Sequence, residues 1–157
     1  MIKESMLRRL KEKGLKITPQ RLAVIDVLVA MRKLHPSASA VYREARSIRK
    51  SLSLSTTYAT LKELSVHGII KTLQFDTGDN RYDANLKEHL NLICNGCGKI
   101  LDYEVSTPTD PGEVEKRTGF SVTDKRLEYY GYCEECRKKG WARGNRLGPT
   151  GSDCHSC

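Results

Sequence analysis

The sequence predicts an α+β protein in which a helical N-terminal domain (residues 1–82) is followed by a mixed α/β domain (residues 83–140) and a flexible tail (residues 141–157). Three observations predict this division. Apolar residues recur with a helical period up to about residue 68 and with a period of two after it. Residues 1–82 carry 16 Lys and Arg against 7 Asp and Glu, whereas residues 83–157 carry 11 against 12. Two C-x-x-C pairs lie in residues 83–140.

Four helices are expected in the first domain. The segment ESMLRRLKEK has apolar residues at helical spacing and stops at Gly14. Thr18 is a candidate N-cap of a second helix, PQRLAVIDVLVAM, because Pro19 then occupies the first helical position. A third helix is expected over residues 39–48, after a loop that holds His35.

The fourth helix, STTYATLKELSVHG, is expected to start from Ser55 as its cap and to end at Gly68. Its apolar face comprises Thr57, Leu61 and Leu64. Its other face is small and polar with one tyrosine, and comprises Thr56, Tyr58, Ala59, Lys62 and Glu63. The segments IIKTLQF and RYDA, joined by the turn DTGDN, then form a hairpin. Three helices followed by a hairpin is the layout of a winged helix-turn-helix.

This layout and the basic charge predict double-stranded DNA binding, with the N-terminal turn of the fourth helix in the major groove. The expected contacts to DNA are Thr56, Tyr58, Ala59, Lys62 and Arg21. Further phosphate contacts are expected from Arg43, Arg46, Arg49 and Lys50. The alternative is a set of ordinary helices with solvated basic faces, which the combination of layout and charge disfavours.

The second domain is expected to contain strands, a short helix and a terminal helical turn. The strands are HLNLIC (residues 89–94), KILDYE (99–104) and SVTDKRLEYYGY (121–132). The helix is PGEVEKRT (111–118), and the helical turn is EECRKKGW (134–141).

Four cysteines in two C-x-x-C pairs predict a structural zinc site. The pairs are Cys94 with Cys97 and, after 35 intervening residues, Cys133 with Cys136. Four thiolates complete a tetrahedral zinc site with no open position. A thioredoxin-type redox couple would need a surrounding βαβ pattern, and a zinc deaminase would need an upstream H-x-E signature; the sequence has neither.

The N-terminal segment is charged and has no apolar run long enough for a signal peptide or a membrane helix, which predicts a cytoplasmic protein with reduced thiols. The tail holds a further pair, Cys154 and Cys157, with His155 between them. Redox or metal chemistry there remains open, but glycine, proline and serine around the pair favour a flexible segment.

Several motifs occur in a fixed order: TPQRLAVIDVL, HPSASAVY, STTYATLKEL, NRYDA, EHLNLICNGCGKILDY, GFSV and RLEYYGYCEEC. Together they resemble the ferric uptake regulator family over about residues 5–139, and most of all its peroxide-responsive repressors. The resemblance implies a homodimer that binds an AT-rich inverted repeat in double-stranded DNA. It also implies that the second domain mediates dimerisation and that the four cysteines hold structural Zn²⁺.

The resemblance also implies a regulatory Fe²⁺ or Mn²⁺ site formed by His35, Asp83, His89, Asn91 and Asp102. Members that sense iron alone often have glutamate at the positions of the two aspartates, so this pattern resembles the peroxide sensors. His89 and Asn91 alternate on one strand and therefore share a face. Two positions depart from relatives: Asn91 stands where the peroxide sensors have histidine, and Lys125 where many iron-uptake regulators have a histidine of an additional metal site.

The expected function is that of a metal-dependent transcriptional repressor, not an enzyme, in which peroxide acting on the iron form oxidises His35 or His89 and releases DNA. An alternative within the family is an iron- or manganese-responsive uptake repressor whose histidines are never oxidised. A zinc-dependent enzyme or a thiol oxidoreductase that uses the C-x-x-C pairs is a further alternative, and it would leave the basic winged helix without a purpose.

Overall fold

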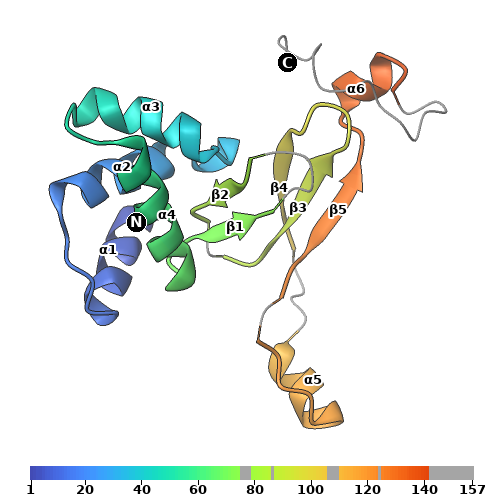
Figure 1. Cartoon of the computed structure of the whole chain (residues 1–157). Helices are drawn as coiled ribbons and strands as arrows, with labels where there is room; N and C mark the ends of the chain where they lie inside the picture. Colours follow the sequence, from blue (N-terminus) through green and yellow to red (C-terminus); the bar gives the residue numbers. More distant parts are fainter. Residues whose placement is uncertain (75–78, 86, 106–109, 124, 142–157) are drawn as a thin grey trace. The chain divides into compact units, whose positions relative to one another are not determined.

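A computed structural model describes residues 1–74, 79–85, 87–105, 110–123 and 125–141 of the chain (Figure 1). The chain divides into two compact units, Met1–Lys87 and Glu88–Cys157. The division falls five residues after the expected boundary at residue 82, so Asp83 belongs to the first unit. None of the described helices is long and apolar enough to span a membrane. The Cys154 and Cys157 pair lies outside the described residues, as does most of the expected hairpin turn.

The first unit is built from helices and one hairpin. Its elements are α1 (Ile2–Glu12), α2 (Pro19–Ala30), the 3₁₀ helix η1 (Arg32–Leu34), α3 (Ala38–Ile48), α4 (Leu54–Val66), β1 (Lys71–Leu73) and β2 (Arg81–Asp83). The expected cap of α2 is confirmed, because Thr18 Oγ1 accepts the backbone N–H of Arg21 at 3.2 Å.

The expected start of α4 is wrong by two residues. Ser53, not Ser55, is the N-cap, and its Oγ accepts the backbone N–H of Thr56 at 3.1 Å. The first strand is also shorter than expected. Ile69 donates its backbone N–H to the carbonyl of Leu64 at 2.8 Å, so it closes the end of α4 instead of entering the hairpin.

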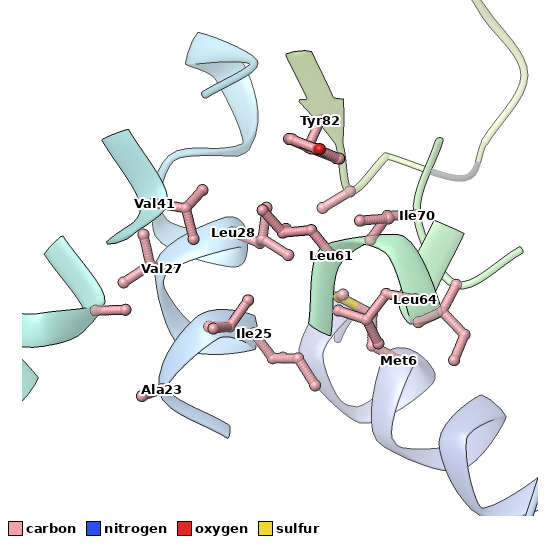
Figure 2. Packing of buried hydrophobic residues seen from close by; sticks show 14 of the residues in the cluster. Met6, Ala23, Ile25, Val27, Leu28, Val41, Leu61, Leu64, Ile70 and Tyr82 are labelled. Carbon is pink, nitrogen blue, oxygen red and sulfur yellow. The ribbon is translucent and has the colours of Figure 1, made fainter. Parts of the chain in front are cut away.

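The hydrophobic core of the first unit is formed where α1, α2, α3 and α4 meet the hairpin. Figure 2 shows Met6, Leu28, Leu61 and Ile70 converging from four segments, with Tyr82 of β2 beside them. All members of this cluster lie between residues 2 and 84. The first unit therefore has a complete core of its own, independent of the second.

The second unit contains β3 (His89–Cys94), β4 (Ile100–Glu104), α5 (Pro111–Thr118), β5 (Glu128–Gly131) and α6 (Glu134–Lys138). Strand β3 lies between β4, which is antiparallel to it, and β5, which is parallel (Figure 1). The expected strand over residues 121–132 is reduced to four residues, because β5 pairs only with Asn91–Cys94 of β3. The bounds of β3 and α5 are as expected.

The two faces of this sheet differ in character. One face carries His89, Asn91 and, across from Asn91 in register, Asp102. The opposite face carries the row Leu101, Leu92 and Tyr129, taken from the three strands in register. Leu101 is 45% exposed and Tyr129 is 67% exposed, so the second face presents apolar side chains to its surroundings.

Candidate functional site

Four thiols converge at one end of the sheet in the second unit. The sulfurs of Cys94, Cys97, Cys133 and Cys136 all lie within 4.8 Å of one another, and none of the four is in a disulfide. Cys97 Sγ and Cys133 Sγ are 3.7 Å apart. A tetrahedron with Zn–S bonds of about 2.3 Å has S–S edges of roughly 3.8 Å, so this spacing fits structural zinc.

Local backbone structure forms this cluster. The first pair lies in the turn between β3 and β4, closed by the N–H of Gly98 on the carbonyl of Cys94 at 2.9 Å. The second pair begins at the N-cap of α6, and the N–H of Cys133 donates to Cys94 Sγ at 3.2 Å. Since β5 runs beside β3, the pairing of strands brings together two C-x-x-C turns that are far apart in sequence.

The thiols differ in acidity. Burial raises the pKa of Cys94, but hydrogen bonds from the backbone N–H groups of Cys133, Cys97 and Gly96 outweigh burial and lower the pKa to about 6. Burial raises the pKa of Cys97 and of Cys136. Without a cation the cluster therefore favours the thiolate of Cys94 over those of Cys97 and Cys136, and binding of zinc displaces protons from the thiols that still carry them.

Trp141, the chain's single tryptophan, packs against the first C-x-x-C turn. Helix α6 ends at Lys138. Two residues later Gly140, with a φ of +82°, turns the chain back so that Trp141 N–H donates to the carbonyl of Cys136 at 3.1 Å. The indole packs directly on Gly96. A Cβ at Gly96 would lie 2.4 Å from Trp141 Cε3 and 2.9 Å from Cys136 Sγ. The glycine of the first C-x-x-C turn is thus required by this close approach.

Replacing Gly96 with alanine is expected to displace Trp141 and to distort the thiol cluster, because neither contact leaves room for a methyl group. The expected result is a zinc affinity at least about tenfold weaker and a red shift of tryptophan emission. Chelator competition and fluorescence spectra test this. Gly131→Ala is the matched control, since a Cβ there meets nothing within 4 Å. Equal zinc affinity in the two variants would contradict the role of Gly96.

In the first unit, His35 and Asp83 form a buried pair. Both are fully buried, and a ring nitrogen of His35 lies within 4.8 Å of a carboxylate oxygen of Asp83. The pairing of the His35 loop with β2 holds them together: Tyr82 donates its N–H to the carbonyl of Pro36 at 3.0 Å, and Ser37 forms an isolated bridge with Arg81. Asp83 Oδ1 also accepts the N–H of Asn85 at 2.6 Å.

His35 also has an uncommon backbone conformation. Its φ of 45° and ψ of 67° place it in the left-handed region, where it ends η1. Non-glycine residues adopt this region infrequently, although histidine is among those enriched there. His35 therefore lies in a left-handed turn after η1, and not in a regular helix or strand, where its imidazole is close to Asp83.

In the second unit, His89, Asn91 and Asp102 share one sheet face. His89 Nε2 lies 3.9 Å from Asp102 Oδ1. Asn91 and Asp102 are directly opposite each other, and the N–H of Asn91 points the other way, to the carbonyl of Leu127 at 2.9 Å. Each unit thus contains one histidine and one aspartate that are close enough to bind the same metal ion. Imidazole and carboxylate donors fit a divalent transition metal such as Fe²⁺ or Mn²⁺.

The residues of α4 that are expected to contact DNA differ in exposure. Tyr58 is 43% exposed, and Ala59 and Lys62 are also exposed, whereas Thr57 is buried. Thr56 is half-buried, and its hydroxyl is hydrogen-bonded to Ser53 Oγ at 2.7 Å. Residues of α2 and α4 line a surface hollow of about 560 Å³, among them Thr18, Gln20, Arg21, Thr56, Ala59 and Lys62.

The chain matches the ferric uptake regulator family over residues 12–130. The chain belongs to this family. It is 38% identical over 139 residues to the peroxide operon regulator of Bacillus subtilis, covering 85% of this chain and 92% of that protein. It is 33% identical over 138 residues to the peroxide-responsive repressor PerR of Staphylococcus epidermidis, covering 87% and 91%.

Solved structures of family members have the same fold. The Campylobacter jejuni peroxide stress regulator matches with a TM-score of 0.64 at 30% identity, over 83% of this chain and 98% of that chain. The Helicobacter pylori ferric uptake regulator, described as having three functional metal-binding sites, matches with a TM-score of 0.65 at 29% identity, over 86% and 93%. Members of this family are metal-responsive, DNA-binding transcriptional regulators, and this chain is such a regulator.

Arg21 and Lys125, two basic residues considered in the sequence analysis, each form an ion pair. Arg21 is 14% exposed at its side chain, donates to the carbonyl of Lys16 and pairs with Glu63 of α4. Arg21 therefore connects the start of α2 to the candidate reading helix. Lys125 pairs with Glu88.

Sequence reasoning missed two functional features of the site. Glu63 was placed only on a polar face, and its pairing with Arg21 spans 42 positions. Trp141 was assigned to a helical turn without a role at the cysteines. The C-x-x-C-x₄-W spacing of residues 133–141 is the signal that indicates it, since it places the indole one turn after the last thiol.

Proposed function

We propose that this chain is a cytoplasmic, homodimeric repressor that binds DNA in a metal-dependent manner and senses peroxide through an Fe²⁺ or Mn²⁺ site. The observation that carries the proposal is the occurrence of one His–Asp pair in each unit: His35 with Asp83, and His89 with Asp102. We further propose that both pairs, together with Asn91, ligate the same metal ion. The similarity to peroxide regulators supports the sensing role.

In this proposal the side chains act as a clamp between the two units. His35 and Asp83 are held by the strand pairing of the first unit, and His89 and Asp102 by the sheet of the second. A shared ion would restrain one unit relative to the other and favour the arrangement in which a dimer presents two α4 helices to DNA. The two-fold symmetry of such a dimer requires an inverted repeat, which in this family is AT-rich.

The peroxide response depends on the imidazoles. A bound Fe²⁺ would supply the electron that opens the O–O bond of hydrogen peroxide. Overall, one peroxide oxygen would be inserted at a ring C–H of His35 or His89 and the other would leave as water, the ring giving up the two electrons that the peroxide accepts. The oxidised ring would be a weaker donor, so the clamp would open and DNA would be released. Mn²⁺ would bind the same donors without supplying this electron, so the manganese form should retain DNA.

Homodimerisation is proposed to use the apolar face of the second unit's sheet. Leu101 and Tyr129 flank Leu92 on this face and are substantially exposed. Leu101→Asp is expected to weaken dimerisation at least about 30-fold. Burial of the leucine side chain in the interface would contribute roughly 2 kcal/mol, and a carboxylate in its place would lose this contribution. Sedimentation velocity measures the effect, with Glu104→Asp on the same strand as control. An unchanged dimer would assign the interface elsewhere.

Tyr58 is proposed to contact the operator from α4. Tyr58→Ala is expected to weaken specific operator binding by about 1–3 kcal/mol, or roughly 5- to 150-fold, while non-specific binding changes little. Fluorescence anisotropy with specific and scrambled duplexes tests this. Val66→Ala, at an exposed position near the other end of the same helix, is the control. Equal specific affinity in both variants would remove α4 as the reading helix.

Two other functions lead to different predictions. A metal-responsive uptake repressor would bind the same DNA and release it on metal depletion only, without oxidation of histidine. A thiol oxidoreductase would need accessible thiols. The cluster instead has Cys136 fully buried, with Trp141 packed against the first C-x-x-C turn, which disfavours catalysis there.

The experiment that tests the proposal uses zinc-loaded protein supplied anaerobically with Fe²⁺ or with Mn²⁺. A duplex selected from a random library by the manganese form serves as the operator. The expected result is metal-dependent binding in both forms and loss of binding in the iron form alone after a small excess of hydrogen peroxide. Peroxide-insensitive binding in both forms would leave the metal-responsive uptake repressor as the function.

A further inference from the structure

Asn91 has an unusual environment for an asparagine in a small sheet. It lies in the middle of β3 and is 6% exposed. Its Oδ1 atom is buried and accepts no hydrogen bond from any residue that the structure describes. Buried amide oxygens nearly always have a donor. A buried oxygen atom without a donor among the described residues is suited to binding a cation.

The direction of this side chain follows from strand geometry. The N–H of Asn91 bonds to Leu127 on the β5 side, so Asn91 and Asp102 form a pair without mutual backbone hydrogen bonds, the closer of the two antiparallel pair types. His89 lies two residues earlier on the same face. Asn91 therefore stands next to His89 and Asp102, the two proposed metal ligands of its own unit.

We propose that Asn91, by offering its Oδ1 atom as a neutral oxygen ligand, sets the metal preference of the regulatory site. The inference rests on the proposed function, because it assumes that His89 and Asp102 bind this ion. With Asn91 the donor set contains two imidazole nitrogens and three oxygens.

Oxygen donors favour Mn²⁺ relative to Zn²⁺, whereas each added imidazole favours Zn²⁺. The amide oxygen is also uncharged, so it adds an oxygen donor without the attraction that a third carboxylate would exert on every divalent cation. Asn91 therefore narrows the usual advantage of Zn²⁺ over Mn²⁺ at this site and protects the sensor from occupation by zinc.

Two variants of the full-length protein with its four-cysteine zinc retained test the role of Asn91. Asn91→His exchanges the oxygen for an imidazole, and Asn91→Leu removes the oxygen at similar size. Mn²⁺ and Zn²⁺ affinities are measured separately by competition with a fluorescent chelator. Lys116→His, which adds an imidazole on the exposed surface of α5, is the control for non-specific zinc binding.

The expected result for Asn91→His is a Zn²⁺ affinity at least about tenfold higher relative to Mn²⁺. For Asn91→Leu we expect Mn²⁺ affinity at least about tenfold lower. With Cd²⁺ in the site, the ¹¹³Cd resonance should move toward that of a nitrogen-richer site in Asn91→His. Unchanged Mn²⁺ affinity in Asn91→Leu, or an unchanged Zn²⁺ to Mn²⁺ ratio in Asn91→His, would overturn the inference.

These outcomes are separable from the failure of the proposed function. If wild-type protein binds no second metal ion, then the regulatory site itself is absent and both proposals fail. If wild-type protein binds the second ion but the variants match it, only the role of Asn91 fails. Neither readout involves DNA or peroxide, so peroxide sensing can be assessed independently.

Discussion

Replacing Cys133 with serine is expected to remove the structural zinc and unfold the second unit while the first unit stays folded. The described buried apolar side chains of the second unit are few, namely Leu90, Ile93 and Ile100 besides the cysteines. Structural zinc contributes about 10–16 kcal/mol of binding free energy in small domains, more than such a core supplies. The first unit has its own core and does not depend on this metal.

Zinc content, far-ultraviolet circular dichroism and limited proteolysis measure this effect. Zinc should fall from one equivalent to near zero, most of the helical signal should remain, and protease should digest the chain beyond residue 88. Cys154→Ser makes the same chemical change in the C-terminal segment and should leave all three readouts unchanged. A Cys133→Ser protein that keeps its zinc and its dimer would contradict the four-thiol assignment.

Replacing His89 with alanine is expected to abolish binding of the regulatory metal while the four-cysteine zinc remains. Loss of a residue that hydrogen-bonds to a metal ligand commonly lowers metal affinity 10–100-fold. Loss of a direct ligand should lower the affinity more than about 100-fold. The other end of β3 stays anchored by Cys94 in the thiol cluster. Metal content should therefore fall from two equivalents to one, and operator binding should no longer respond to Mn²⁺.

His67→Ala is the matched control, because His67 is the C-cap of α4 and belongs to neither His–Asp pair. Elemental analysis after gel filtration, followed by operator titration with and without Mn²⁺, distinguishes the variants. If His89→Ala still binds the second equivalent with wild-type affinity, the regulatory site does not include the ligand face of the second unit.

The sequence predicted the ends of helices and strands correctly where interactions between neighbouring residues determine them. The Thr18 cap and the bounds of β3 and α5, each predicted from a short local segment, are confirmed. The predicted cap of α4 was wrong because SLSLS offers three serines at alternate positions as candidate caps. In the folded chain Ser53 takes this role, because its Oγ accepts the backbone N–H of Thr56. Strand β5 was predicted too long because its length depends on its partner, β3.

The sequence predicted which site residues lie together when they belong to the same strand or turn. Alternation on β3 places His89 and Asn91 on one face, and C-x-x-C spacing pairs the thiols. The proximity of His35 to Asp83 depends on Pro36 accepting a hydrogen bond from Tyr82, a contact that no local period encodes. Family resemblance supplied that pairing, and the buried state of Asn91 Oδ1 required the structure.

The most direct test of the central claim is a map of oxygen addition by peptide mass spectrometry after treatment of the Fe²⁺ form with hydrogen peroxide. The account predicts one added oxygen on His35 or His89, none on His67, and none on any histidine of the Mn²⁺ form. It also predicts that the oxidised fraction of protein equals the fraction that releases the operator. Release of the operator with both His35 and His89 unmodified would contradict peroxide sensing at this site.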